Sequence, residues 1–172
     1  MTAIVGIASE GIVYIGGDRG LSDNDSILSM PRPKVVMNGE YLIGYAGSLG
    51  VGQLIQMIDL PVPGKNPEKT LRTSFTKSFK ESLEEYGPDI TKEDNDTDFL
   101  IGVKGKLFEY SISDWSVAEV SYSAIGSGAS IALGSLYTSQ NYKDQEKRVR
   151  ISIEAACQLS PTCQLPIDIY KI

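Results

Sequence analysis

The stretch TAIVGIASEGIVYIGGD, residues 2–18, decides the fold because it encodes two short strands joined by a tight turn. Residues 2–8 and 12–16 are apolar and rich in β-branched side chains, which favour an extended backbone. Glu10 and Gly11 lie between them, where a glycine-containing pair is typical of a turn. The chain is therefore predicted to open with an antiparallel hairpin whose second strand ends at a GGD triplet.

A second hairpin is predicted by VVMNGEYLIGYAG, residues 35–47. Two apolar runs flank Asn38 and Gly39, and an Asn-Gly pair between such runs is the strongest short-range hairpin signal. The polar residues that connect the two hairpins, as far as Ser29, are interpreted as a loop.

The rest of the chain alternates blocks of helix and strand. Helices are expected over about 50–60, 66–86, 127–140 and 144–159, and strands over 99–103, 106–112, 115–120, 122–125 and 166–172. Two blocks of strands and two blocks of helices indicate an α+β architecture, in which two stacked antiparallel sheets lie between helix layers. We expect residues 1–172 to form a single domain.

Composition excludes several classes of function. The chain has 172 residues and no histidine, which removes serine–histidine and cysteine–histidine catalysis and histidine-ligated zinc. Its net charge of −6 argues against a nucleic-acid surface. No phosphate-binding P-loop motif and no apolar run long enough for a membrane span occur. We expect a soluble, cytoplasmic protein with neither nucleic acid nor membrane as a partner.

Neither a metal nor a cofactor is expected. Cys157 and Cys163 are too few for a four-cysteine zinc site and too close together for a good disulfide framework, so both are predicted to be buried reduced thiols. Residues 89–98 carry alternating aspartates, as calcium loops do. They lack the glycine at the sixth position and the glutamate at the twelfth, which favours a solvated loop.

Thr2 is a candidate nucleophile. Once Met1 is removed, this residue carries both a hydroxyl and a free α-amine. The amine has an ordinary pKa of about 7.7–8.0, which suits a general base near neutral pH. A threonine activated by its own terminal amine is an established nucleophile design that needs no histidine.

Four other residues complete a candidate site around Thr2. Asp18 ends the strand that returns beside Thr2, and Lys34 is expected to enter the third strand of the same sheet. A lysine lowers the pKa of a nearby hydroxyl, and an aspartate keeps that lysine charged. Gly47 offers a backbone N–H to an oxyanion, and Ser127 offers a relay hydroxyl. Taken singly, each has a structural alternative: a turn cap, an exposed lysine or a tight turn.

Together these features resemble the proteasome β-subunit family. The matching motifs keep their order along nearly the whole chain: TAIV at 2–5, GGD at 16–18, Lys34, GYAG at 44–47 and AIGSG at 124–128. The likeness is closest to the bacterial HslV-type peptidases. It implies the N-terminal nucleophile hydrolase fold, a four-layer αββα sandwich.

The same resemblance implies a threonine peptidase that assembles into homo-oligomeric rings, cleaves peptides or unfolded proteins and works with a separate ATPase. The residue roles carried over by motif match are Thr2 as nucleophile, Asp18 and Lys34 as charge partners, Gly47 as oxyanion donor and Ser127 as relay hydroxyl. Ser22 falls where the family's backbone pairs with an extended substrate.

The chain departs from the family pattern after its last helix. The family has an acidic or metal-binding turn there, whereas Gln158 stands about where we place the acid. This departure keeps a second interpretation open, namely a catalytically silent ring or scaffold subunit. A small-molecule amidase on the same fold is a third. We further expect the side chains of Thr2, Asp18 and Lys34 to point into a site and not into the core.

Overall fold

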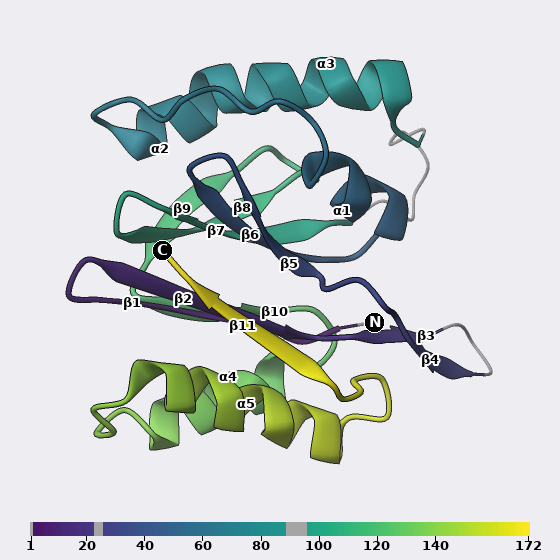
Figure 1. Cartoon of the computed structure of the whole chain (residues 1–172), viewed down its shortest axis with the longest axis vertical. Helices are drawn as coiled ribbons and strands as arrows, with labels where there is room; N and C mark the ends of the chain where they lie inside the picture. Colours follow the sequence, from purple (N-terminus) through teal and green to yellow (C-terminus); the bar gives the residue numbers. More distant parts are fainter. Residues whose placement is uncertain (1, 23–25, 89–95) are drawn as a thin grey trace.

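The computed structural model of the chain describes residues 2–22, 26–88 and 96–172 and has four layers (Figure 1). Two antiparallel sheets stack face to face at the centre. Helical segments between residues 49 and 86 cover the outer face of one sheet, and those between 129 and 159 cover the outer face of the other. The predicted αββα sandwich is confirmed.

One central sheet contains the first predicted hairpin. Its strand order is β10 (Tyr122–Ile125), β1 (Ile4–Ser9), β2 (Ile12–Asp18) and β11 (Ile167–Lys171), with antiparallel neighbours throughout. The register pairs Ile4 with Gly17 and Ser9 with Ile12, so the turn at residues 10 and 11 is as predicted. Because β2 continues to Asp18, that residue lies at the same end of the sheet as Thr2.

The other central sheet contains the second hairpin. Its order is β5 (Val35–Asn38), β6 (Tyr41–Ala46), β7 (Asp98–Val103), β8 (Lys106–Ser111) and β9 (Val117–Val120). Asn38 pairs with Tyr41 across the predicted turn. The two hairpins that open the chain therefore lie in different sheets and face each other.

Residues 19–29 are not simply a loop, so that prediction is wrong. Two three-residue strands, β3 (Gly20–Ser22) and β4 (Ile27–Ser29), pair antiparallel and project beyond the sandwich at one end (Figure 1). Strands this short carry too few residues for an alternating pattern, and Leu28 is 61% exposed. These two strands therefore lack the alternation of apolar and polar residues by which a half-buried strand is recognised in a sequence.

The helices mostly follow their predicted ranges. The bounds are α1 (Leu49–Ile55), α2 (Pro67–Thr70), a π-helical turn (Leu71–Phe75), α3 (Thr76–Tyr86), α4 (Ala129–Thr138) and α5 (Gln145–Leu159). The predicted cap holds, since Asn66 accepts a hydrogen bond from the Lys69 amide at 3.1 Å. The first helix is shorter than predicted because Asn38 donates to the carbonyls of Ile55 and Ile58, both at 2.9 Å, and so caps its end.

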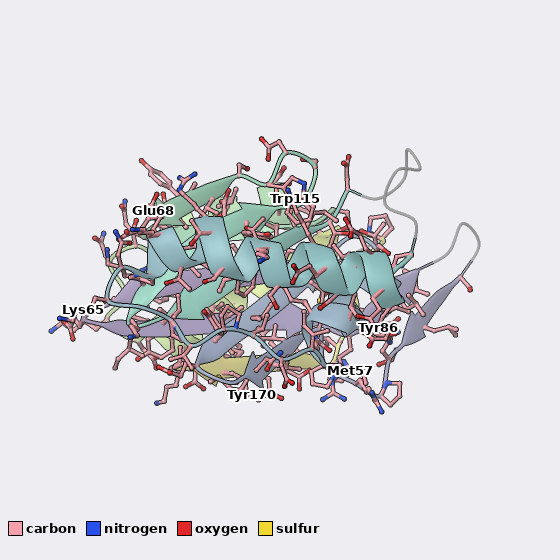
Figure 2. All side chains as sticks on the ribbon, turned by 90° about the horizontal axis from the view of Figure 1, so that it is seen from above. Met57, Lys65, Glu68, Tyr86, Trp115 and Tyr170 are labelled. Carbon is pink, nitrogen blue, oxygen red and sulfur yellow. The ribbon has the colours of Figure 1, made fainter. Side chains whose placement is uncertain are left out.

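Three apolar layers hold the sandwich together. Between α3 and the β5–β9 sheet, aromatic rings pack with centroids 5.2–6.4 Å apart; they belong to Tyr41, Phe75, Phe79, Phe99, Tyr110 and Trp115. Figure 2 shows this helix layer crossing the sheet, with Glu68 toward one end and Tyr86 toward the other. Aliphatic side chains fill the space between the sheets, and α4 and α5 cover the remaining face.

No helix among the described residues is long and apolar enough to cross a membrane.

Candidate active site

Thr2 lies immediately before β1, in the space between the two sheets. Its side chain is buried, with 4% of the residue exposed. Two contacts from the segment before α4 hold its backbone: the Gly128 amide donates to the Thr2 carbonyl at 3.1 Å, and the Thr2 nitrogen donates to Ser127 Oγ at 3.1 Å. Both the carbonyl and the nitrogen of Thr2 are therefore held in place.

Lys34 contacts the Thr2 hydroxyl directly. Its Nζ donates to Thr2 Oγ1 at 2.6 Å, to Asp18 Oδ1 at 3.1 Å and to the Gly20 carbonyl. The side chain is 3% exposed. Lys34 precedes β5, so it approaches Thr2 from the facing sheet. The sequence had predicted that Lys34 lies in the same sheet as Asp18. That prediction was wrong because a hairpin signal identifies which strands pair but not which sheets stack.

Asp18 joins the segments that meet at the site. Its carboxylate accepts from the Ala3 amide at 2.9 Å, the Gly20 amide at 2.8 Å and the Gln164 amide at 3.1 Å, in addition to Lys34. Asp18 is 0% exposed. The three side chains converge on one site, as expected, but the Asp18–Lys34 ion pair is buried, so removal of either partner will also affect stability.

Burial sets the electrostatics of the pair. It lowers the pKa of Lys34 from its ordinary value, and the neighbouring Asp18 carboxylate opposes this by favouring the charged amine. A lysine with a lowered pKa, hydrogen-bonded to a hydroxyl, stabilises the alkoxide that forms when the hydroxyl loses its proton. The arrangement is thus suited to activating Thr2 Oγ1 as a nucleophile.

Two glycines allow the backbone to close around Thr2. Gly47 has φ +127°, and a Cβ there would lie 2.2 Å from the Asp96 carbonyl. Gly126 has φ +92°, and a Cβ there would lie 2.3 Å from the Thr2 carbonyl. Side chains are excluded at both positions by backbone conformation and by space.

A cavity of about 270 Å³ opens beside Thr2 and carries two carboxylates. Its lining residues are Thr2, Ala46, Gly47, Asp96, Asp98, Gly126 and Ser127. Thr97, between the two aspartates, is fully buried and accepts a hydrogen bond from the Ser48 amide at 3.0 Å. Because alternate residues of an extended segment point to opposite sides, this anchor directs Asp96 and Asp98 toward the cavity. No cationic side chain lines it among the described residues.

The turn after α5 reaches Ser127 through a hydroxyl. Ser127 Oγ lies 2.7 Å from Thr162 Oγ1, which lies 2.7 Å from Ser160 Oγ. Gln158, which we placed at the family's acidic position, is exposed and lines a different cavity with Cys157 and Cys163. That placement is wrong because α5 ends at Leu159 and the chain returns to the site only afterwards.

Both cysteines are free, as predicted, but only Cys163 is fully buried and Cys157 is half-buried. Burial raises the pKa of Cys157 to about 12 and also raises that of Cys163, which keeps both as thiols at neutral pH.

The remaining predicted positions are less informative. Ser22 ends β3. The loop prediction for residues 89–98 falls largely on 89–95, outside the described residues. In the described part of the chain, no group of three or more acidic or cysteine side chains is arranged to hold a metal ion.

The structure therefore brings Thr2, Asp18, Lys34, Gly47 and Ser127 together. Sequence reasoning missed Thr162, Ser160, Asp96 and Asp98. The hydroxyls lie in an S-x-T pattern that has no distinctive signal, and the aspartates were interpreted only as part of a solvated loop.

Comparison of the sequence with known proteins identifies proteasome β subunits. The chain is 31% identical over 168 residues to the proteasome subunit beta of Parafrankia sp. (strain EAN1pec) and 30% identical to that of Frankia casuarinae. Each alignment covers 90% of this chain and 60% of the relative, so the chain spans about three fifths of their length. No family model matches the chain.

Comparison of the structure identifies the same fold. Thiobacillus denitrificans BPH, solved in complex with epoxomicin, superposes with a TM-score of 0.84 at 19% identity, covering 99% of this chain and 97% of that one. HslV of Trypanosoma brucei superposes with a TM-score of 0.71 at 18% identity, covering 98% of each chain. These likenesses show that the chain shares the αββα fold of BPH and HslV, and in sequence it is similar to proteasome β subunits.

Proposed function

We propose that the chain is a threonine peptidase subunit of a proteasome-like ring complex. The observation that carries this proposal is the 2.6 Å hydrogen bond from Lys34 Nζ to Thr2 Oγ1 in a buried site that also holds Asp18. A buried lysine with an acidic partner needs a reason to be retained, because an apolar pair of similar volume is often at least as stable. Activation of a hydroxyl supplies that reason.

The proposed reaction proceeds in two steps. Thr2 Oγ1 attacks the peptide carbonyl while the free α-amine takes the hydroxyl proton, and the Gly47 N–H stabilises the resulting oxyanion. Collapse breaks the C–N bond, the α-ammonium returns its proton to the leaving amine, and an ester to Thr2 remains. Water, deprotonated by the same amine, then hydrolyses the ester and restores the hydroxyl.

We expect peptides with a basic side chain near the cleaved bond to be preferred, because Asp96 and Asp98 make the cavity beside Thr2 negative. Internally quenched peptides containing Lys, Leu or Glu at matched positions test both activity and preference. Asp96→Asn/Asp98→Asn should reduce the preference for Lys over Leu about fivefold, since an exposed charge contact contributes about 1 kcal/mol. Asp59→Asn, an exposed aspartate in a different cavity, is the matched control.

Three outcomes would contradict parts of this proposal. Equal cleavage of the Lys and Leu peptides by the wild-type protein would remove the acidic cavity as a determinant of specificity. If protein with a free Thr2 cleaves none of the peptides, the silent scaffold becomes the better interpretation. Cleavage of small amides but not of peptides would favour the amidase.

Ring assembly is part of the same proposal, and the outer face of α4 supports it. Ser130, Leu133, Gly134 and Tyr137 recur at the spacing of one helical face. Leu133 is 36% and Tyr137 63% exposed, and nothing lies within 4 Å of a Cβ built on Gly134. A face of apolar and small residues is suited to close packing against a second copy of the chain.

Leu133→Glu/Tyr137→Glu is expected to shift the protein to smaller species in sedimentation velocity, because two charges would be buried in the interface. Tyr86→Glu is the matched control, since Tyr86 is 69% exposed at the end of α3 on the opposite helix layer. A wild-type protein that sediments only as an 18.7 kDa species over a wide concentration range would refute the ring.

A further inference from the structure

A continuous row of hydroxyls leads away from the Thr2 nitrogen. Thr2 N donates to Ser127 Oγ at 3.1 Å, Ser127 Oγ lies 2.7 Å from Thr162 Oγ1, and Thr162 Oγ1 lies 2.7 Å from Ser160 Oγ. The Thr162 amide also donates to Ser160 Oγ at 3.3 Å. These oxygens come from the segment before α4 and from the turn after α5, which the fold brings together across 35 residues.

The row contains no carboxylate. The turn reads Ser160-Pro161-Thr162-Cys163-Gln164, and each of its side chains is uncharged as a hydroxyl, thiol, amide or ring. The nearest buried acid, Asp18, is already occupied by three backbone amides and Lys34. Any hydrogen-bond network that reaches the Thr2 nitrogen from the turn after α5 therefore consists of hydroxyls and contains no carboxylate.

The direction of such a row matters chemically. A hydroxyl donates one hydrogen and accepts through its lone pairs, so Ser127 can either accept from the α-amine that removal of Met1 frees or donate to its lone pair. Ser160 Oγ accepts from the Thr162 amide. Either oxygen can donate in the Ser127–Thr162 and Thr162–Ser160 pairs, and the Thr2 carbonyl, 3.5 Å from Ser127 Oγ, is a second acceptor for the Ser127 hydrogen. The order that uses the two 2.7 Å contacts has Thr162 donating to Ser160, Ser127 donating to Thr162, and Ser127 accepting from Thr2.

We propose that Thr162 and Ser160 are positioning residues that hold the Ser127 hydroxyl with its lone pair toward the Thr2 nitrogen. This inference rests on the proposed function. While the α-amine carries the proton taken from Thr2 Oγ1, the oriented Ser127 accepts one N–H of the ammonium and stabilises it. A freely rotating Ser127 would also donate to the amine lone pair and so compete with its role as a base. The relay gains or loses no proton over the cycle.

The test compares Thr162→Val, Thr162→Ser and Thr138→Val in protein whose intact mass shows Thr2 as its first residue. Thr138 is exposed at the end of α4, and its hydroxyl donates to the Gly134 and Ser135 carbonyls of its own helix at 3.1 and 3.0 Å, which makes it a matched control. Thr162→Val should lower kcat about threefold to tenfold with KM unchanged, the effect of one lost hydrogen bond. Thr162→Ser should restore kcat, and Thr138→Val should leave it at the wild-type value.

A second readout is independent of turnover. Competitive acetylation across pH gives the pKa of the Thr2 α-amine, which should be lower in Thr162→Val because the ammonium loses its oriented acceptor. The other titratable groups around this nitrogen are unchanged in the variant, namely Lys34, Asp18, Asp96, Asp98 and Cys163. Thermal melting monitors the fold.

Each outcome decides the question. Thr162→Val that matches Thr138→Val in both kcat and amine pKa overturns the relay, while active wild-type protein leaves the proposed function intact. Wild-type protein that has a free Thr2 and no turnover overturns the proposed function, whereas the amine pKa still reports on the relay. A loss of kcat in Thr162→Ser equal to that in Thr162→Val would show that the methyl group, and not the hydroxyl, is what the site needs.

Discussion

Thr2→Ala is expected to abolish peptide hydrolysis, with a fall in kcat of roughly 10⁴-fold or more. The substitution removes the hydroxyl that Lys34 Nζ contacts at 2.6 Å and leaves the α-amine without a hydroxyl proton to accept. A chain that keeps Met1 should be equally inactive, because its Thr2 nitrogen is an amide and cannot act as a base. Fluorogenic peptide hydrolysis, paired with intact-mass measurement of each preparation, gives both results.

Thr2→Ser is the matched control for this prediction. It keeps a hydroxyl and an α-amine at the same position, so activity should persist at a reduced level. Full activity in protein that quantitatively retains Met1 would defeat the mechanism. Activity in Thr2→Ala would point to a different nucleophile or a contaminating peptidase, and an independent preparation would separate the two.

Lys34→Ala is the second substitution expected to have a large effect, with kcat lowered about 10²–10³-fold or more, the magnitude typical of losing an oriented charge at the reacting atom. Asp18→Asn should act through the same step, since Asp18 holds Lys34 in place. The effects of the single and double variants should therefore not add. Because burial lowers the pKa of Lys34, activity that needs its charge should decline on the alkaline side at a lower pH than a surface lysine would give.

Stability must be measured beside activity in these variants. Removal of one partner of a buried ion pair leaves an uncompensated charge and costs about 3–5 kcal/mol. Lys34→Met/Asp18→Asn removes both charges and should regain part of the stability lost in Lys34→Ala, without regaining activity. Thermal melting separates the two effects. If folded Lys34→Ala keeps wild-type turnover, another group tunes the Thr2 hydroxyl.

The sequence predicted local pairing well and the stacking of layers poorly. Turn residues such as Asn38 and Gly39 define which strands pair, so both hairpins were identified. Nothing in a hairpin signal says that Lys34 will approach Thr2 from the facing sheet, because that depends on packing between sheets. The site residues were nevertheless grouped correctly, since Asp18 and Gly47 lie at strand ends that converge on one edge of the sandwich.

Contacts made by irregular segments were out of reach of the sequence. Thr162 meets Ser127 only because the chain turns back after α5, and a turn of this kind has no periodicity to reveal it. In the sequence, Asp96 and Asp98 are recognisable only as part of an acidic loop. That composition predicts a solvated segment but not the side to which the carboxylates point. The buried Thr97 between them turns them toward the cavity, and its burial is a property of the folded chain.

The two crowded glycines affect how related chains should be searched for activity. Gly47 and Gly126 are required by backbone atoms within 2.2–2.3 Å of any added Cβ, and this constraint acts whether or not Thr2 is a working nucleophile. A related chain that had lost peptidase activity but still folded would thus keep these two glycines under selection for folding alone. Genome surveys that score these glycines identify chains with the αββα fold. Surveys that score Thr2, Asp18 and Lys34 together identify candidate enzymes.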